Sequence, residues 1–262
     1  MKISVCMATY NGEKFIKYQL ESIIHQLAEN DEIIISDDGS TDSTIEIVQS
    51  FVDPRIRILH NQSVSIKHFK MYKSYAVSKN FENALAHATG EIIFLSDQDD
   101  WWHGNKVKVA LEQFHENKVN LLVHDALVVD ENYETLAQSY FELVNSKAGF
   151  IKNIIVNSYL GCCLVFDRKI LLLSLPFPSR LVAHDVWIGL IAEQSGKVAF
   201  IEDKLIKYRR HNYTVTNSGA RSQHKFIAKI GIRIQLIVQL AVRTIQFKTA
   251  FSKKWSRMPV KL

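Results

Sequence analysis

Three aspartates fall within four residues in Asp97-Gln98-Asp99-Asp100, directly after the apolar run of residues 92–96. Carboxylates this close repel one another, so the folded chain must offset their repulsion. A divalent cation such as Mg²⁺ or Mn²⁺ prefers oxygen ligands and bridges the phosphates of a diphosphate. The alternative is a solvated turn whose aspartates cap a helix. The preceding strand and the pair Trp101-Trp102 favour a cation site beside an apolar wall, although Trp102 suits the core equally well.

Two further polar clusters have the same setting, at the end of an apolar run. In Asp37-Asp38-Gly39-Ser40, a carboxylate is available to hydrogen bonds from a ribose or a nucleobase, but the motif is also ordinary turn chemistry. In Thr9-Tyr10-Asn11-Gly12, the ring of Tyr10 is suited to stack on a base, or is simply a surface aromatic. Each cluster is weak evidence when it is taken alone.

The first half of the chain alternates short apolar runs with segments of helical spacing, which predicts an α/β fold. Strands are expected at residues 3–8, 32–36, 55–60, 91–96 and 120–127, with helices between them and an irregular loop at residues 61–79. Strands separated by helices form parallel sheets, and ligands bind at the carboxyl ends of such strands. The three polar clusters are therefore expected to meet at one edge of the sheet.

The bulk composition describes a folded chain that is not built on disulfides. Of 262 residues, 47% are hydrophobic and only 4 are proline, which favours a sizeable core. The cysteines are Cys6 and the adjacent pair Cys162-Cys163, a spacing that suits reduced core residues better than a zinc site. The start of the chain does not resemble a secretory signal, and no run of 18 uncharged apolar residues occurs, so we expect a cytoplasmic protein without a spanning helix.

The charge of the chain is divided unevenly. Residues 220–262 carry ten Lys and Arg and no acidic residue, which leaves a formal charge of −5 on residues 1–219 from a total of +5. We therefore expect a catalytic domain at 1–219 and a basic helical extension at 220–262. Apolar and basic residues alternate there in the pattern of an amphipathic helix, which favours an anionic membrane surface over packing on the domain. The residues of the apolar stripe are Phe226, Ile230, Ile234, Leu236, Ile237 and Leu240.

Together, the motifs and their order resemble glycosyltransferase family 2, in particular its bacterial O-antigen and capsule branch of rhamnosyl- and glucosyltransferases. The similarity covers roughly residues 1–215. It implies the GT-A fold, with a mostly parallel central sheet flanked by helices, and a metal-dependent, inverting, non-processive transfer. The expected cofactor is Mn²⁺ or Mg²⁺, and the expected donor is a UDP- or dTDP-sugar.

The resemblance also implies roles for individual residues. Those expected to bind the nucleotide sugar are Ala8, Tyr10 and Asp38 at the nucleoside, and Lys79, Asp97 and Arg209 at the phosphates. Those expected to hold the metal are Asp97, Asp99 and His211. For His211, a surface position is an equal alternative.

The expected catalytic base is Asp185, in the pair His184-Asp185, where the family has an acidic residue before the aspartate. A carboxylate in reach of the acceptor hydroxyl would take its proton as the hydroxyl attacks. The alternative is that Asp185 stabilises a helix N-terminus.

Expected partners are a lipid-diphosphate-linked saccharide acceptor and the inner face of the cell membrane, with no nucleic acid. Two other function classes compete with this interpretation. A sugar-phosphate nucleotidyltransferase would carry a Gly-rich basic loop after the first strand, which residues 9–13 lack. A nucleic-acid-binding protein would use the basic extension but would have no need of the aspartates.

Overall fold

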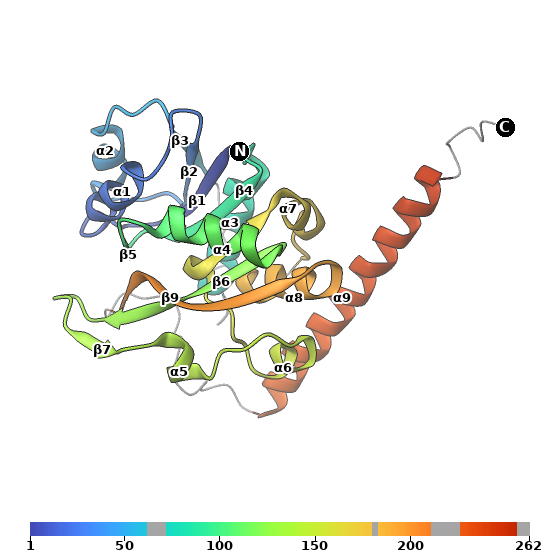
Figure 1. Ribbon diagram of the computed structural model, residues 1–262. Helices are drawn as coiled ribbons and strands as arrows, with labels where there is room; N and C mark the ends of the chain where they lie inside the picture. The colour runs from blue at the N-terminus through green and yellow to red at the C-terminus, as the bar shows by residue number, and fades with distance from the viewer. Residues whose placement is uncertain (62–71, 180–182, 211–225, 256–262) are drawn as a thin grey trace. The chain divides into compact units, whose positions relative to one another are not determined.

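The computed structural model describes residues 1–61, 72–179, 183–210 and 226–255. The chain divides into two compact units, Met1–Ala220 and Arg221–Leu262. The first unit is built on one nine-stranded sheet in the order β3-β2-β1-β4-β8-β6-β9-β5, with β7 paired to β6. Helices flank this sheet (Figure 1).

Four strands form the parallel half of the sheet. β1 (Ile3–Thr9) lies between β2 (Glu32–Asp37) and β4 (Ile92–Asp97), and β3 (Ile56–His60) pairs with β2. The connections contain α1 (Ile16–Ile24), α2 (Thr44–Gln49) and α3 (Tyr72–Ala86). The interiors of β1, β2 and β4 are mostly apolar and fully buried, whereas the edge strand β3 is only half-buried, and the burial of these apolar side chains drives the association of the strands. The parallel sheet expected from the alternating pattern is confirmed in this half.

The other half of the sheet is mixed. β8 (Leu164–Asp167) runs antiparallel to both β4 and β6 (Leu121–Val129), while β9 (Val198–Arg209) is parallel to β6. Two short strands, β5 (Trp101–Trp102) and β7 (Thr135–Ala137), pair antiparallel with β9 and β6. The parallel pairs expected from the sequence are therefore those among β1–β4 and the pair β6–β9, and the antiparallel strands β5, β7 and β8 make the sheet mixed.

Short helical turns explain the change in strand direction. The chain reaches β8 through α5 (Tyr140–Val144), α6 (Phe150–Ile155) and the 3₁₀ turn η1 (Gly161–Cys163) instead of through one crossover helix. A parallel pairing needs such a crossover, whereas an antiparallel one does not. The remaining helices of this unit are α4 (Lys106–Asn117), α7 (Arg168–Ser174) and α8 (His184–Ser195).

Helix α3 replaces part of the loop expected at residues 61–79. Residues 62–71 lie outside the described part of the chain, but the expectation was wrong for residues 72–79. The buried face of α3 is partly polar, so it lacks a clear apolar period. Asn80 donates to the carbonyl oxygen of Thr9 (3.0 Å) and Asn83 to the hydroxyl of Ser36 (2.9 Å). These contacts attach α3 to the carboxyl ends of β1 and β2.

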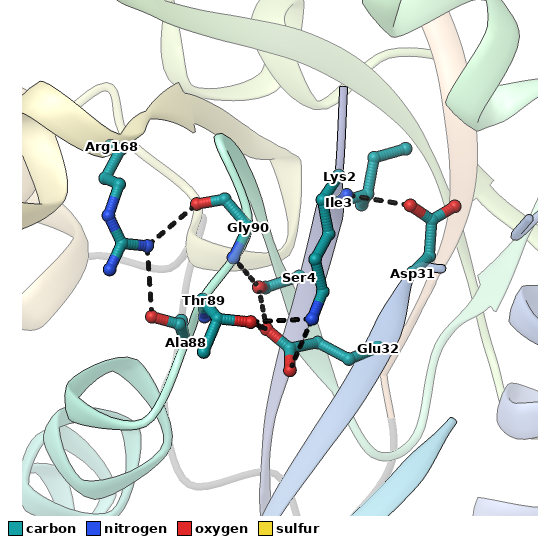
Figure 2. Close-up of polar contacts among 9 residues, drawn as sticks. All are labelled: Lys2, Ile3, Ser4, Asp31, Glu32, Ala88, Thr89, Gly90 and Arg168. Atoms are coloured by element: carbon teal, nitrogen blue, oxygen red, sulfur yellow. Dashed lines mark hydrogen bonds and ion pairs between the residues drawn. The ribbon is translucent and has the colours of Figure 1, made fainter. Parts of the chain in front are cut away.

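The amino edge of the parallel strands is held by a charged network around Glu32 (Figure 2). The hydroxyl groups of Ser4 and Thr89 and the backbone N–H of Thr89 all donate to the Glu32 carboxylate, and Lys2 forms an ion pair with it at 3.4 Å. The Gly90 N–H donates to the Ser4 hydroxyl (2.8 Å). Burial acts to raise the pKa of Glu32, but the hydrogen bonds and Lys2 outweigh it and hold the pKa below its ordinary value. The polar groups of this network are therefore satisfied by one another, without a ligand.

The second unit contains α9 (Phe226–Trp255), a helix of 30 residues. Its exposed large aliphatic side chains recur every three or four residues and so share one face: Ile230, Ile234, Ile237, Val238, Val242 and Ile245. The window Ile230–Phe247 has a mean hydropathy of 1.2 and is long and apolar enough to cross a membrane by length and composition. This window includes Arg233 and Arg243, so it is not a run of 18 uncharged apolar residues, and the expectation that no helix spans a membrane stays a prediction.

Candidate functional site

The register of the parallel strands brings the three polar clusters to one edge of the sheet. Ala8 lies opposite Asp97, and Thr9 lies opposite Asp37. Asp38 donates its backbone N–H to the Thr9 carbonyl oxygen (2.9 Å). The convergence predicted from strand polarity is thus present at the carboxyl ends of β1, β2 and β4.

The two aspartates after β2 have different environments. Asp37 is buried, and its carboxylate accepts hydrogen bonds from the hydroxyl of Thr9 (2.9 Å) and from the backbone and hydroxyl of Ser40 (2.8 and 2.6 Å). It therefore builds the turn. Asp38 is half-buried and accepts a hydrogen bond from the Asn61 amide at 3.1 Å. Of the pair, Asp38 is the one that remains accessible to a ligand, as the sequence analysis expects.

Gln98 ties the acidic segment to the loop after β1. Its side-chain oxygen accepts from the N–H of Tyr10 and its amide donates to the Tyr10 carbonyl oxygen, both at 3.0 Å. A Cβ at Gly12 would lie 2.4 Å from the same amide oxygen, so a larger residue there would displace the Gln98 side chain from this position. This clamp fixes the backbone of Tyr10, whose side chain is 56% exposed. Sequence reasoning missed Gln98, because a glutamine between aspartates carries no distinctive signal.

An acidic cluster lies at the centre of the edge. One ligand atom each from Asp97, Asp100 and Cys162 lies within 4.8 Å of the others. Asp100 is fully buried; its Oδ1 accepts from the backbone N–H of Arg209 (3.0 Å), whereas its Oδ2 has no hydrogen-bond partner. A buried carboxylate oxygen without a partner is costly unless a ligand completes it.

Lys106 supplies an internal cation below this cluster. It is fully buried, its Nζ donates to the Cys162 carbonyl oxygen (2.9 Å), and it lies 4.0 Å from the ring centre of Trp102. Burial lowers the pKa of Lys106 to about 8, against the opposing effect of Cys163, Cys162, Asp100 and Asp97. Its position at the start of a helix, directly after the exposed Gly104 and Asn105, gave no sign of this role. Trp102 is a core residue, so the suggested sugar-facing wall is reduced to Trp101, which is half-buried.

The carboxyl groups of the cluster hold protons unusually well. Burial, and then the charges of Asp100, Asp99 and Asp185, raise the pKa of Asp97 well above its ordinary value. Burial and the charge of Asp99 raise the pKa of Asp100 to about 7. One internal lysine therefore does not neutralise the cluster, and an added cation would reduce the repulsion among its carboxylates.

The donor set fits a hard divalent cation. Carboxylate oxygens suit Mg²⁺ or Mn²⁺, and the unpartnered Oδ2 of Asp100 offers a free ligand position. Asp97 lies in this set with Asp100, which was not predicted as a ligand, and the role of Asp97 as a ligand stays a prediction. The Cys162 thiol beside them is a soft donor whose pKa burial raises well above its ordinary value, so it is not a ligand for such a cation. Within the described chain Asp99 is half-buried and adjacent to the set, and its role as a ligand stays a prediction. His211 lies outside the described residues.

Asp185 is close enough to the cluster that its charge raises the pKa of Asp97. It occupies the first turn of α8, and its Oδ1 accepts from the Val186 N–H (2.8 Å). Burial raises the pKa of Asp185 to about 6, although hydrogen bonds from Val186, from its own backbone and from Asn157 oppose the shift. A carboxylate with a pKa near 6 ionises below neutrality and is suited to accept a proton.

His184 is buried beside Asp185. Its ring stacks on Phe81 at a centroid distance of 4.2 Å, and its Nε2 has no hydrogen-bond partner. A Cβ at Gly161 would lie 3.1 Å from that Nε2, so glycine allows this approach. Burial lowers the pKa of His184 to about 3. The residue is therefore neutral where the family's acidic residue would be charged.

The two expected phosphate-binding cations already have partners. Lys79 forms an ion pair with Glu82 at 2.5 Å. The guanidinium of Arg209 is buried 4.5 Å from the ring centres of both Phe15 and Tyr133, and it donates to the Tyr133 hydroxyl. The roles of Lys79 and Arg209 at a diphosphate stay predictions.

Comparison with known proteins agrees with this geometry. The family model of glycosyl transferase family 2 matches residues 4–172. The chain is 27% identical over 195 residues to the Escherichia coli UDP-Glc:alpha-D-GlcNAc-diphosphoundecaprenol beta-1,3-glucosyltransferase WfgD, covering 74% of this chain and 71% of WfgD.

Two solved structures share the fold. S. aureus TarS 1-349 in complex with UDP-GlcNAc has a TM-score of 0.66 and 22% identity, covering 91% of this chain and 66% of that one. Mannosyltransferase PcManGT from Pyrobaculum calidifontis, in complex with GDP-Man and Mn²⁺, has a TM-score of 0.55 and 20% identity, covering 93% and 64%. The chain thus spans about two thirds of the length of these two solved structures.

The fold and the acidic edge define a glycosyltransferase of the GT-A type. The chain belongs to glycosyl transferase family 2. This assignment decides against a nucleotidyltransferase and against a non-enzymatic binding protein.

Proposed function

We propose that this enzyme is an inverting, metal-dependent, non-processive glycosyltransferase of surface polysaccharide synthesis. It transfers a sugar from a UDP- or dTDP-sugar to a hydroxyl of a saccharide carried on a lipid diphosphate. The observation that carries the proposal is the position of Asp185, a carboxyl with a pKa near 6, beside the acidic cluster. A base next to a diphosphate-binding edge is what a single displacement at the anomeric carbon requires.

The donor would lie along the carboxyl edge of β1, β2 and β4. Tyr10 offers a stacking surface held by Gln98, Ala8 borders the same strand end, and Asp38 offers an acceptor for ribose hydroxyls. Asp97 and Asp100 would lie near the diphosphate of the donor, at the carboxyl end of β4. Lys79 and Arg209 would reach it only by exchanging their present partners, Glu82 and Tyr133.

The base acts on the acceptor. The Asp185 carboxylate takes the proton of the attacking hydroxyl, and the bond from the anomeric carbon to the leaving diphosphate breaks on the opposite face, which inverts the configuration. Asp97 with Asp100 or Asp99 would hold Mn²⁺ or Mg²⁺, and such an ion would supply a positive charge against the leaving diphosphate. Neutral His184 adds no second negative charge beside the base.

A lipid-linked acceptor is supported by three observations. WfgD, as its name states, acts on a diphosphoundecaprenol-linked sugar. Residues 220–262 carry ten basic and no acidic residues, which favours an anionic membrane surface. The apolar face of α9 is exposed in the described helix. We therefore place the enzyme on the cytoplasmic face of the cell membrane.

A donor screen tests the proposal. Purified enzyme with Mn²⁺ or Mg²⁺ and a GlcNAc-diphospho-polyprenol acceptor is offered UDP-, dTDP- and GDP-sugars in turn. We expect one nucleotide class, UDP or dTDP, to support transfer, with inversion visible by NMR of the product. Asp185→Asn should retain donor binding while its turnover falls by about a thousandfold. Loss of donor binding in that variant would make Asp185 a ligand-holding residue and would contradict its role as base.

A further inference from the structure

The segment from Leu143 to Val156, in the first unit, exposes large aliphatic side chains to solvent. Ile151 and Ile155 lie one turn apart on α6 and therefore on the same side of the helix, with exposed fractions of 74% and 53%. Leu143 lies near the end of α5 and Val156 directly follows α6, and both side chains are about half exposed as well. Isolated exposed aliphatics are common, but four within 14 residues, two of them on one side of α6, indicate a binding surface.

The same segment is basic. Lys147 is exposed and Lys152 is half-buried, and no acidic residue occurs between Glu142 and Asp167. The Lys152 ammonium donates to the Asn145 carbonyl oxygen (2.6 Å), which keeps its charge close to the segment. The acidic residues Glu142 and Glu193 border the segment, and Glu193 accepts hydrogen bonds from Gly149 and Asn153. Within the segment itself both charged side chains are lysines, and apolar side chains beside an exposed lysine are complementary to an anionic lipid surface.

The residue types favour lipid over a protein partner. Energetically dominant residues in protein interfaces are enriched in Trp, Tyr and Arg, and such interfaces are depleted of Lys. The exposed side chains here are Leu, Ile and Val with Lys. That combination is typical of helices that lie at a membrane surface with aliphatic side chains inserted among the lipid headgroups.

This surface is connected directly to the candidate base. α6 packs on α8, whose first turn contains Asp185. The chain after α6 continues into Asn157, whose side chain forms a hydrogen bond with Asp185. Asn157 is itself fixed by paired hydrogen bonds with the backbone of Tyr159, at 2.8 and 2.9 Å. A surface bound through α6 would therefore lie close to the reacting hydroxyl.

We propose that the α6 surface, formed by Leu143, Lys147, Ile151, Ile155 and Val156, docks on an anionic membrane. Docking there presents Asp185 to an acceptor carried in the same bilayer. Only the second statement rests on the proposed function, because membrane binding is measured without any sugar transfer. This contact belongs to the first unit and is additional to the one proposed for α9.

The test is flotation of the full chain with vesicles of phosphatidylglycerol and phosphatidylcholine, compared with phosphatidylcholine alone. The variant Ile151→Ser with Ile155→Ser should lower the partition coefficient on the anionic vesicles about tenfold, since two aliphatic side chains no longer insert. Leu172→Ser on α7, where the side chain is 62% exposed, is the matched control and should change it less than about twofold. Lys147→Glu should weaken binding to the anionic vesicles and leave binding to the neutral ones unchanged.

The α6 variants are repeated in a chain that carries Ile234→Ser and Val238→Ser, so that binding through α9 cannot mask the effect. Unchanged partition of the α6 variants in both backgrounds would overturn the inference. So would a dimer in sedimentation equilibrium that the α6 variant dissociates without altering vesicle binding, because the surface would then be covered by a second copy. α6-dependent vesicle binding without transfer to any lipid-linked acceptor would contradict the proposed acceptor and leave the docking surface supported.

Discussion

The carboxyl groups at the two ends of the parallel strands have pKa values that are shifted in opposite directions. At the amino edge, Glu32 receives hydrogen bonds from Ser4 and Thr89 and an ion pair from Lys2, and its pKa lies below the ordinary value (Figure 2). At the carboxyl edge, Asp97 and Asp100 are crowded together and their pKa values are raised. The first edge is complete as folded, and the crowded carboxyl groups of the second are the reason that we propose a cation there.

Polar atoms without partners follow the same division. Several buried side-chain atoms without a hydrogen-bond partner in the described chain belong to residues of the carboxyl edge or its neighbours: Asn80 Oδ1, Asp100 Oδ2, His184 Nε2 and Arg209 Nε. None of the side chains in the Glu32 network is among the described chain's unpartnered buried atoms. Unsatisfied buried polar groups are typical of sites that bind a ligand, and favourable contacts elsewhere in the fold offset the stability that they cost.

The largest effect on stability is expected at Lys106. Lys106→Met removes the only cation buried within hydrogen-bond reach of Cys162 in the described chain and leaves Asp97 and Asp100 uncompensated. The free energy of unfolding at pH 8 should fall by about 3 kcal/mol. Lys108→Met, at an exposed position of the same helix, is the control and should change it by less than about 0.5 kcal/mol. Urea unfolding measures both free energies. An equal loss in the two variants would contradict the claim that Lys106 compensates the carboxylates of Asp97 and Asp100.

An intermediate effect is expected at the amino edge. Glu32→Gln weakens the hydrogen bonds from Ser4 and Thr89 and removes the attraction to Lys2, so unfolding should become easier by about 1–2 kcal/mol at pH 7. Because the pKa of Glu32 is lowered on folding, its contribution is present above the ordinary pKa and is lost as the pH falls through the folded value. The exposed Glu29→Gln should show neither change, and thermal unfolding from pH 3 to 7 checks this.

The smallest effect has the opposite sign. Asp100→Asn keeps an oxygen for the Arg209 N–H but removes a charge, so the metal-free chain should gain about 1 kcal/mol of stability at pH 8. The pKa of Asp100 is raised to about 7 on folding, so wild-type stability falls between about pH 4 and 7 as the unfolded chain loses its proton first. This part of the fall should be absent from Asp100→Asn and present in the control Asp203→Asn. A destabilised Asp100→Asn would contradict the comparison of the two edges.

The sequence was sufficient for the parts of the fold that repeat a local pattern. Apolar runs predicted β1, β2, β3, β4 and β6 to within about two residues, and strand polarity predicted which ends would meet. The antiparallel entry of β8 was not predictable in this way, because strand direction depends on the long connection before it. Helix α3 was missed in part because its buried face is polar, with Asn80 and Asn83 contacting strand ends.

For the site, residue type and spacing identified the carboxylates but not their surroundings. Asp97 and Asp185 were predicted and lie close together. Lys106, Cys162 and Gln98 were not predicted, because a lysine on a helix and a glutamine in a turn are ordinarily solvated. Their roles arise from contacts between residues 56 to 88 positions apart, such as Lys106 with the Cys162 carbonyl. No local pattern contains such information.

The most direct test of the carboxyl edge is the binding of the nucleoside diphosphate of the active donor, UDP or dTDP, with and without Mn²⁺. In calorimetric titrations, Mn²⁺ should strengthen binding to the wild-type chain at least about tenfold, and Asp97→Asn should abolish that gain. Equal affinity with and without Mn²⁺, or a full Mn²⁺ effect in Asp97→Asn, would contradict the claim that a cation completes this edge against the diphosphate.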